Sequence, residues 1–183
     1  TTSCRSRTPP RQCVENGAVD VASGSLSMVM MSVASDWTRE RLEAIKADST
    51  LAVVIPALNE EGTIAQVVSA IAAELGELVD ELVVMDSLSS DSTAEVAASA
   101  GARVHSVADV RPDLGVHSGK GEALWKSQFV TSADVVAFID ADLTEWGTHF
   151  ILGVVGPLLA HPRVALCRGF YDRVLDIDGD VTL

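Results

Sequence analysis

From residue 51 onward, short runs of apolar residues alternate with longer segments in which apolar residues recur at helical spacing. The short runs are rich in Val, Ile and Leu, which is typical of buried strands. They predict strands at residues 51–56, 80–86, 102–107, 134–140 and 163–171. The segments between them predict helices at residues 60–75, 91–101, 119–131 and 148–161. We expect Pro157 to disturb the last turn of the final helix.

Strands that are apolar along their whole length and alternate with helices indicate a mostly parallel sheet with helices on both faces. Right-handed crossovers between such strands give a Rossmann-like, doubly wound α/β fold. No linker or internal repeat divides residues 51–175. We therefore expect one domain over residues 49–183.

The chain ahead of this domain has a different pattern. Residues 1–35 show no sustained period and are rich in Ser, Thr, Pro and Gly, so we expect a disordered leader. Residues 36–48 predict a short helix with Asp36 as its N-cap and with Trp37 and Leu42 on the face that packs against the domain.

Composition and charge exclude several classes of function. The chain has 183 residues, is 48% hydrophobic and carries a formal net charge of -13. An acidic balance argues against a nucleic-acid partner, because phosphate backbones are bound by clustered Lys and Arg. No apolar run approaches the ~20 residues that span a bilayer, so we expect no membrane partner. Cys4, Cys13 and Cys167 form neither a metal-ligand spacing nor a disulfide framework, and we expect a reducing, cytoplasmic location.

Polar residues follow three of the predicted strands where each strand ends. They occur at residues 56–60, 86–87 and 140–142. In doubly wound sheets, ligands bind beyond the carboxyl ends of the strands. Because these ends share one edge of a parallel sheet, we expect the three clusters to converge on a ligand cleft.

Asp140 and Asp142 are the most informative pair in these clusters. In extended backbone, residues two apart point to the same side, and two carboxylates there repel each other unless a cation lies between them. Mg²⁺ or Mn²⁺ meets that need, since such ions take one or two carboxylates together with phosphate and water oxygens. The alternative is structural: Asp142 caps the next helix and Asp140 pairs with a lysine.

The other segments also carry two interpretations each. Asn59 and Glu60 either bind a nucleotide or stabilise the first turn of the following helix, which the residues alone favour. Asp86 either accepts a hydrogen bond from a base or ends its strand, while the serines and Asp91 after it have helix-capping chemistry. Lys120, between two glycines at a predicted helix start, either binds an anion or is solvated.

Four motifs, in this order, resemble a known family. "VVIPALNEEGTI", "ELVVMDSLSSDSTAEVA", "GKGEALWKS" and "VVAFIDADL" resemble the nucleotide-binding half of GT-A glycosyltransferases, and in particular the glucosyl-3-phosphoglycerate synthases of actinobacteria. The likeness covers residues 37 to about 175. "GKGEALW", "GPLL" and "GFYDR" are the parts most particular to that family.

The resemblance implies an enzyme, a hexosyltransferase that moves glucose from UDP-glucose to the 2-hydroxyl of 3-phosphoglycerate. It implies retention at the anomeric carbon, a Mg²⁺ or Mn²⁺ cofactor, a homodimer, and a place in methylglucose lipopolysaccharide biosynthesis. Carried over residue by residue, the metal ligand is Asp142. The implied substrate-binding residues are Pro56, Ala57, Leu58, Asn59, Glu60, Ser87, Lys120, Asp140 and Ala141.

The sequence departs from the family pattern in two places within the motifs and at its end. Leu88 stands where the family usually has glycine, which we expect to alter the turn beside the base, and Ala141 stands where it often has serine. The resemblance also implies acceptor-binding and catalytic residues beyond Leu183, so no catalytic residue is assigned. Two further hypotheses follow: another GT-A transferase with, for example, a polyprenyl-phosphate acceptor, or a donor-binding module without turnover.

Overall fold

The computed structural model describes residues 31–143 and 146–169, together with the backbone of four three-residue strands outside those ranges. Most of the predicted leader, residues 1–35, therefore lies outside the described residues. The elements in chain order are β1 (Val19–Val21), β2 (Ser25–Ser27), the 3-10 turn η1 (Ala34–Asp36), α1 (Arg39–Lys46), β3 (Leu51–Ala57), α2 (Ile64–Leu75), η2 (Gly76–Leu78), β4 (Glu81–Asp86), α3 (Thr93–Ser99), β5 (Arg103–Ser106), η3 (Pro112–Leu114), α4 (Lys120–Ser127), β6 (Val135–Phe138), α5 (His149–Ala160), β7 (Leu175–Ile177) and β8 (Asp180–Thr182).

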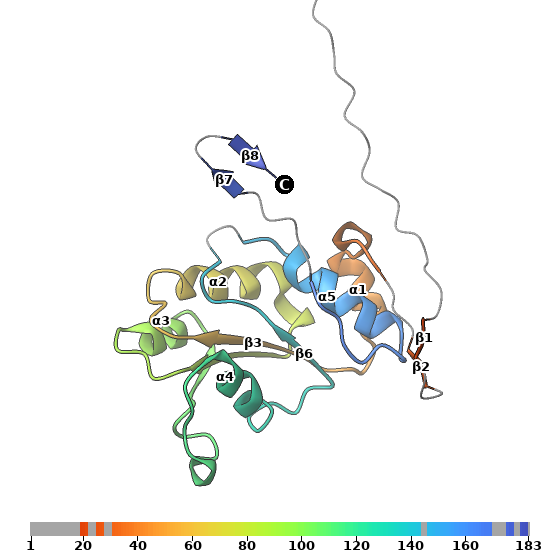
Figure 1. Ribbon diagram of the computed structural model, residues 1–183. Coiled ribbons are helices and arrows are strands. Elements are labelled where there is room, and N and C mark those ends of the chain that lie inside the picture. Colours follow the sequence, from red (N-terminus) through yellow and green to blue (C-terminus); the bar gives the residue numbers. More distant parts are fainter. Residues whose placement is uncertain are drawn as a thin grey trace, which may run out of the picture.

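The main sheet contains four parallel strands in the order β5-β4-β3-β6 (Figure 1). Strand β3 is central, and its residues Leu51–Ile55 are buried because helices cover both of its faces. The register sets Ala57 of β3 beside Asp86 of β4, so these two strands end level with each other. The predicted doubly wound α/β fold is confirmed for these four strands.

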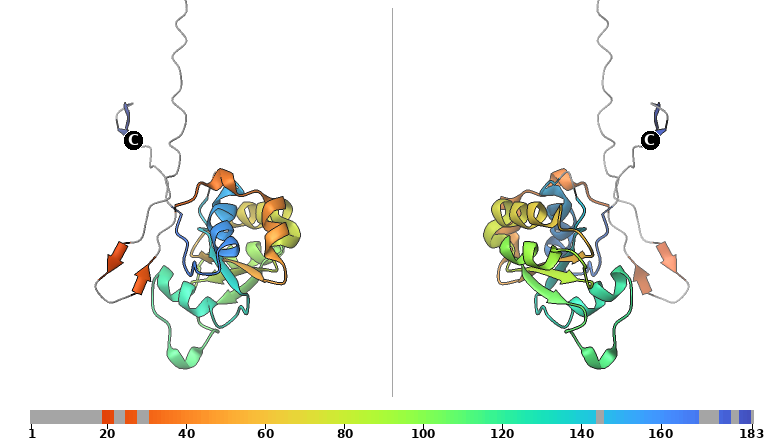
Figure 2. Two further views of the ribbon diagram at one scale, coloured as in Figure 1. Left: turned by 90° about the vertical axis from the view of Figure 1, so that its right-hand side faces the viewer. Right: turned by 90° about the vertical axis from the view of Figure 1, so that its left-hand side faces the viewer.

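Two hydrophobic clusters fill the space between the sheet and the helices. The larger one joins alternate side chains of β3, such as Val53 and Ile55, to residues of α1, α2, α3 and α5. The smaller one lies on the opposite face and joins Val54 and Met85 to Ala123 of α4. The side views show the same division, with α1, α2 and α5 on one side of the sheet and α4 on the other (Figure 2).

The predicted N-terminal helix is present but begins later than expected. It spans Arg39–Lys46, and its cap is Thr38, whose side chain accepts a hydrogen bond from the backbone N–H of Arg41. The expected cap Asp36 instead lies in the 3-10 turn η1. The predicted packing is confirmed, because Trp37 and Leu42 are buried in the larger cluster.

The strand predicted at residues 163–171 is wrong as far as the structure describes it. Residues 164–169 form no strand, and Leu166 is 84% exposed. A run with strand propensity becomes a strand only where a neighbouring strand pairs with it. Pro157 lies inside α5, which nevertheless continues to Ala160.

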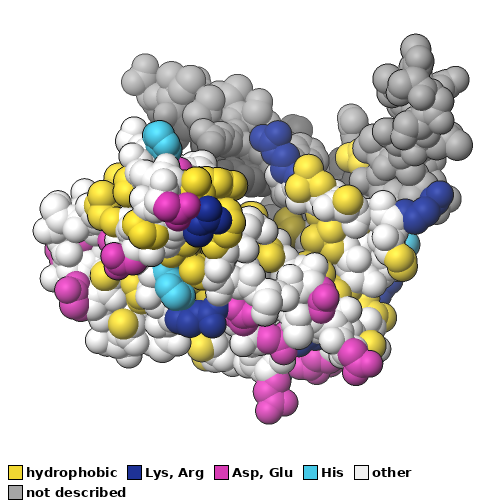
Figure 3. Space-filling model, turned by 90° about the horizontal axis from the view of Figure 1, so that it is seen from below, with side chains coloured by type: hydrophobic (Ala, Val, Ile, Leu, Met, Phe, Trp, Pro, Cys, Tyr) yellow, Lys and Arg dark blue, Asp and Glu magenta, His cyan; other side chains and the backbone are white. Residues whose placement is uncertain are grey.

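The face that α4 covers carries exposed hydrophobic side chains among charged ones (Figure 3). Trp125 and Phe129 pack edge to face, with ring centroids 5.4 Å apart, and each is 45% exposed. Trp125 is therefore not part of the core. In the described part of the chain, no helix combines the length and apolar character that crossing a membrane requires.

Candidate functional site

A pocket of about 540 Å³ opens at the carboxyl edge of the main sheet. Its walls come from the ends of β3, β4 and β6, from the segment after β5 and from the start of α4. The lining residues are Pro56, Ala57, Leu58, Glu60, Ser87, Leu88, Val107, Val116, His117, Ser118, Gly119, Lys120, Asp140, Ala141 and Asp142. Nine of the ten residues predicted to bind substrate or metal are among them, and Asn59 is the exception.

The floor of the pocket is fixed by the level ends of β3 and β4. Ala57 is buried, and its carbonyl oxygen accepts a hydrogen bond of 2.9 Å from the backbone N–H of Ser87. On the far side, Ala141 is buried after β6, whereas Leu58 beside Ala57 is 53% exposed. The buried Ala57 and Ala141 thus fix the backbone of the pocket, and the exposed side chain of Leu58 is accessible to a ligand.

Asn59 joins the loop after β3 to the loop after β4. Its side-chain oxygen accepts hydrogen bonds from the backbone N–H of Ser90 at 2.8 Å and from the hydroxyl of Ser90 at 3.2 Å. Its own backbone N–H donates to the Ser89 hydroxyl at 2.9 Å. The N-cap of α2 is Thr63, which makes no side-chain capping bond. Asn59 therefore neither caps that helix nor lines the pocket, but holds its two loops together.

The acidic residues after β4 have structural roles. The buried Asp86 accepts from the backbone N–H of Ser89, at 3.3 Å to its nearer oxygen, which closes the turn. Asp91 accepts from the backbone N–H of Thr93 at 3.0 Å and from its hydroxyl. The bond from the Thr93 hydroxyl lowers the pKa of Asp91 below its usual range, although partial burial opposes this. The predicted capping chemistry of Asp91 is confirmed, one residue ahead of the N-cap Ser92.

Asp140 and Lys120 form an ion pair across the pocket, and each side chain is 54% exposed. The lysine pairing considered for Asp140 is thus correct. The helix-capping role considered for Asp142 is wrong, because α5 begins at His149 after its N-cap Thr148. Asp142 is exposed and lines the pocket.

The pocket lining carries an excess of negative charge, which a bound cation would neutralise. Glu60, Asp140 and Asp142 contribute three carboxylates to the lining, against the single ammonium group of Lys120. In the described part of the chain, no three His, Cys, Asp or Glu side chains come together as a complete metal site. Mg²⁺ and Mn²⁺ do not need one, because ligand phosphates and water complete their coordination. The carboxylates of Asp142 and Asp140 therefore fit such an ion.

Several lining residues escaped the sequence-based prediction. His117 and Ser118 lie just before Gly119 and Lys120, and their position beside that motif is a signal that could have marked them. Leu88 is 54% exposed at the pocket. Val107 and the exposed Val116 come from the segment after β5, which carries no motif.

The chain is similar to proteins of known family. The profile of glycosyl transferase family 2 matches residues 52–179. The chain is 47% identical over 143 residues to the glucosyl-3-phosphoglycerate synthase of Mycolicibacterium smegmatis, covering 78% of this chain and 47% of that protein. It is 48% identical over 146 residues to the synthase of Mycobacterium tuberculosis, covering 80% of this chain and 45% of that protein. The chain thus spans less than half the length of these relatives.

Solved structures give the same result. The crystal structure of the Mycobacterium tuberculosis synthase in complex with Mn²⁺, uridine-diphosphate-glucose and phosphoglyceric acid superposes with a TM-score of 0.64 at 50% identity. This match covers 68% of this chain and 44% of that one. Together with the family profile, which covers well over half of the residues, it establishes that the chain belongs to glycosyl transferase family 2.

Proposed function

We propose that the protein transfers glucose from UDP-glucose to 3-phosphoglycerate, with retention at the anomeric carbon and with Mg²⁺ or Mn²⁺ bound at Asp142. The observation that carries the proposal is the pocket, which gathers the predicted residues from three strand ends and the start of α4. Relatives nearly half identical to this chain are glucosyl-3-phosphoglycerate synthases, and one was crystallised with Mn²⁺ and UDP-glucose.

The pocket is suited to the parts of a sugar nucleotide. The exposed Leu58 and Leu88 offer apolar surface to the uracil ring, and Pro56 and Ala57 line the pocket beside them. Lys120 places a positive charge at the other wall, where the diphosphate would lie. A nucleotide thus finds an apolar end and a cationic end in one cleft.

The pair between Lys120 and Asp140 would rearrange when a donor binds. Both side chains are about half exposed, and an exposed ion pair contributes only about 0–1 kcal/mol. A diphosphate can therefore draw Lys120 towards itself at little cost, which releases Asp140 to face the ribose or the metal. Lys120 then orients the diphosphate, and the buried Ala141 keeps the wall close to the sugar.

A divalent ion held by Asp142 and Asp140 would neutralise negative charge on the departing diphosphate. Without it, the diphosphate would face three carboxylates and one lysine. We therefore expect UDP binding to require the metal.

Calorimetry of UDP binding with and without Mn²⁺ tests this function. For Asp142→Asn, we expect UDP affinity in the presence of Mn²⁺ to fall at least about tenfold, which is about 1.4 kcal/mol. We also expect the remaining binding to lose its dependence on Mn²⁺. Asp48→Asn is the matched control, because Asp48 is exposed in the turn after α1 and should leave both values unchanged. Equal metal dependence in the parent and in Asp142→Asn would contradict the proposal.

The acceptor is tested separately. UDP-glucose consumption should depend on 3-phosphoglycerate, and the anomeric configuration of the product, read by NMR, should match that of the donor. A preference for polyprenyl phosphate would instead support a different transferase of the family. Binding of UDP without any consumption would support a donor-binding module.

The remaining parts of the proposal concern organisation and partners. We assign residues 49–183 to one nucleotide-sugar-binding domain, with the helix at 36–48 packed on it. The net charge of -13 supports small-molecule partners rather than nucleic acid. We also propose that the protein is a homodimer, that it is located in the cytoplasm and that it does not contact a membrane.

A further inference from the structure

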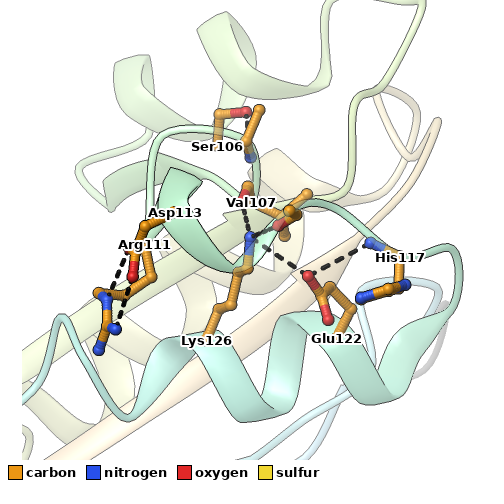
Figure 4. Close-up of polar contacts among 9 residues, drawn as sticks. Ser106, Val107, Arg111, Asp113, His117, Glu122 and Lys126 are labelled. Atoms are coloured by element: carbon orange, nitrogen blue, oxygen red, sulfur yellow. Dashed lines mark hydrogen bonds and ion pairs between the residues drawn. The ribbon is translucent and has the colours of Figure 1, made fainter.

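Lys126 of α4 is a fully buried lysine with no role in the site described above. Its relative exposure is 0%, and a buried ammonium group is costly unless its donors are satisfied. Its Nζ donates to the carbonyl oxygens of Val107 at 2.7 Å and Gly115 at 2.6 Å. It also pairs with Glu122 at 3.2 Å (Figure 4). A lysine has three N–H donors, and these contacts use all of them.

Glu122 links the ammonium group of Lys126 to the backbone of His117. Its Oε1 accepts a hydrogen bond of 3.3 Å from the backbone N–H of His117 as well as the contact from Lys126. Burial opposes ionisation of Glu122, but the bonds from Lys126 and His117 outweigh it and lower the pKa of the carboxyl. The pair therefore holds residues 107, 115 and 117 from one helix face.

Residues 107, 115 and 117 lie in the segment that forms one wall of the pocket. Val107, Val116, His117 and Ser118 all line it. Residues 111–121 are exposed throughout, so burial of apolar surface contributes little to their position. Val107 is held by its N–H, which donates to the Asp86 carbonyl of β4 at 2.9 Å, and by burial in the smaller cluster. In residues 111–118, backbone bonds such as that from the Gly115 N–H to the Pro112 carbonyl are local and shape turns without tying this part to the domain. Residues 111–118 are tied to the domain by the contacts from Lys126 and Glu122, and at their start by Arg111, whose guanidinium lies 5.0 Å from the centroid of the Phe129 ring.

We propose that Lys126, together with Glu122, is a positioning residue of the nucleotide pocket. The buried ammonium group and its partner Glu122 hold residues 115–118 where they line the pocket, and so set donor affinity without touching the donor. This inference rests on the proposed function only for the identity of the ligand.

Lys126→Met tests the proposal, because methionine keeps length and apolar character but removes the charge and the donors. We expect UDP affinity in the presence of Mn²⁺ to fall about tenfold or more. We also expect amide hydrogen exchange in residues 108–119 to accelerate about tenfold or more, while amides of β3 and β4 keep their protection. Lys126→Arg retains the charge and donors in a larger side chain, and it should lose less UDP affinity and less exchange protection than Lys126→Met.

Lys46→Met is the matched control. Lys46 is also a largely buried lysine in an ion pair, with its side chain 12% exposed and its Nζ 2.6 Å from Asp80. It lies on α1, away from the pocket lining. Its loss should lower stability but leave UDP affinity and exchange in residues 108–119 unchanged.

If Lys126→Met does not fold, Glu122→Ala provides a second test of whether this pair positions the pocket wall. Alanine favours the helix, and the change removes the acceptor shared by Lys126 and His117. We expect the same faster exchange in residues 108–119 and the same weaker UDP binding. Parent-like exchange in that segment, or faster exchange with parent-like UDP affinity, would overturn the proposal. If the parent binds no UDP, the proposed function fails, while the exchange measurement still decides whether Lys126 anchors the segment.

Discussion

Two residues in the loops that follow β3 and β4 hold their backbone in the left-handed region, Asn59 at φ 58° and Leu88 at φ 65°. Asparagine tolerates that conformation, and in it the side-chain oxygen of Asn59 accepts the bonds from Ser90. Leucine does not tolerate it well, since its Cβ approaches the following carbonyl oxygen. A glycine at this position would take the same φ without strain.

Leu88→Gly should therefore stabilise the protein. Relief of about 1–2 kcal/mol of left-handed strain exceeds the roughly 0.5–1 kcal/mol that glycine's extra freedom in the unfolded chain costs. We expect the free energy of unfolding in urea to rise by about 0.5–1 kcal/mol. Leu58→Gly is the control, because Leu58 is equally exposed at the pocket but has no positive φ, and its replacement should lower stability. A stability loss of the same size in both variants would contradict the strain at Leu88.

The burial of Lys126 could not be predicted from the sequence. A Glu and a Lys four residues apart on a helix, as Glu122 and Lys126 are, usually form a solvated pair. Here carbonyl groups of a distant segment surround the ammonium group and bury it. That burial depends on tertiary contacts, which the spacing does not contain.

At the scale of elements, the sequence predicted the four strands of the main sheet, and it also predicted a strand in a run that has no partner in the described residues. It did not predict the three-residue strands β1, β2, β7 and β8. Apolar runs at β3, β4, β5 and β6 pair with one another, so their propensity and their structure agree. The run at residues 163–169 has a similar composition but no pairing. Pairing is set by residues far away in the chain, and a local pattern cannot report it.

The packing of α5 against the N-terminal segment depends on glycine. A Cβ placed at Gly156 would lie 2.1 Å from the ring of Trp37, and one at Gly153 would lie 3.0 Å from Ala34. Trp37 also donates its indole N–H to the Ser32 hydroxyl at 2.7 Å, which limits how far the ring can move. Close approach of this ring to the helix is therefore possible only at a glycine.

Gly156→Ala should destabilise the protein although alanine is the better helix former. Overpacking typically costs about 1–3 kcal/mol, against roughly 1 kcal/mol gained in helix propensity. We expect a net loss of up to about 2 kcal/mol in the free energy of unfolding. Gly62→Ala, where an added Cβ meets nothing within 4 Å, should stay within about 0.5 kcal/mol of the parent. Unchanged stability of Gly156→Ala would show that Trp37 is free to move aside.

At the scale of the whole molecule, parallel topology brings the functional residues together. Residues 57, 87 and 141 are far apart in the chain, yet they meet because β3, β4 and β6 end at one edge. This rule made the position of the pocket predictable from sequence. The roles of single residues within the pocket were less predictable. Asn59, which was expected to bind substrate, lies outside the lining and joins two loops, and Val116 lines the pocket from a segment without a motif.

A crystal structure of the chain with UDP and Mn²⁺, recorded at a wavelength where manganese scatters anomalously, is the most direct test. We expect one anomalous peak about 2.0–2.3 Å from a carboxylate oxygen of Asp142, with the diphosphate on its other side and the uracil between Leu58 and Leu88. A nucleotide bound in another part of the molecule, or one bound in this pocket with no metal near Asp142, would contradict the assignment of the site.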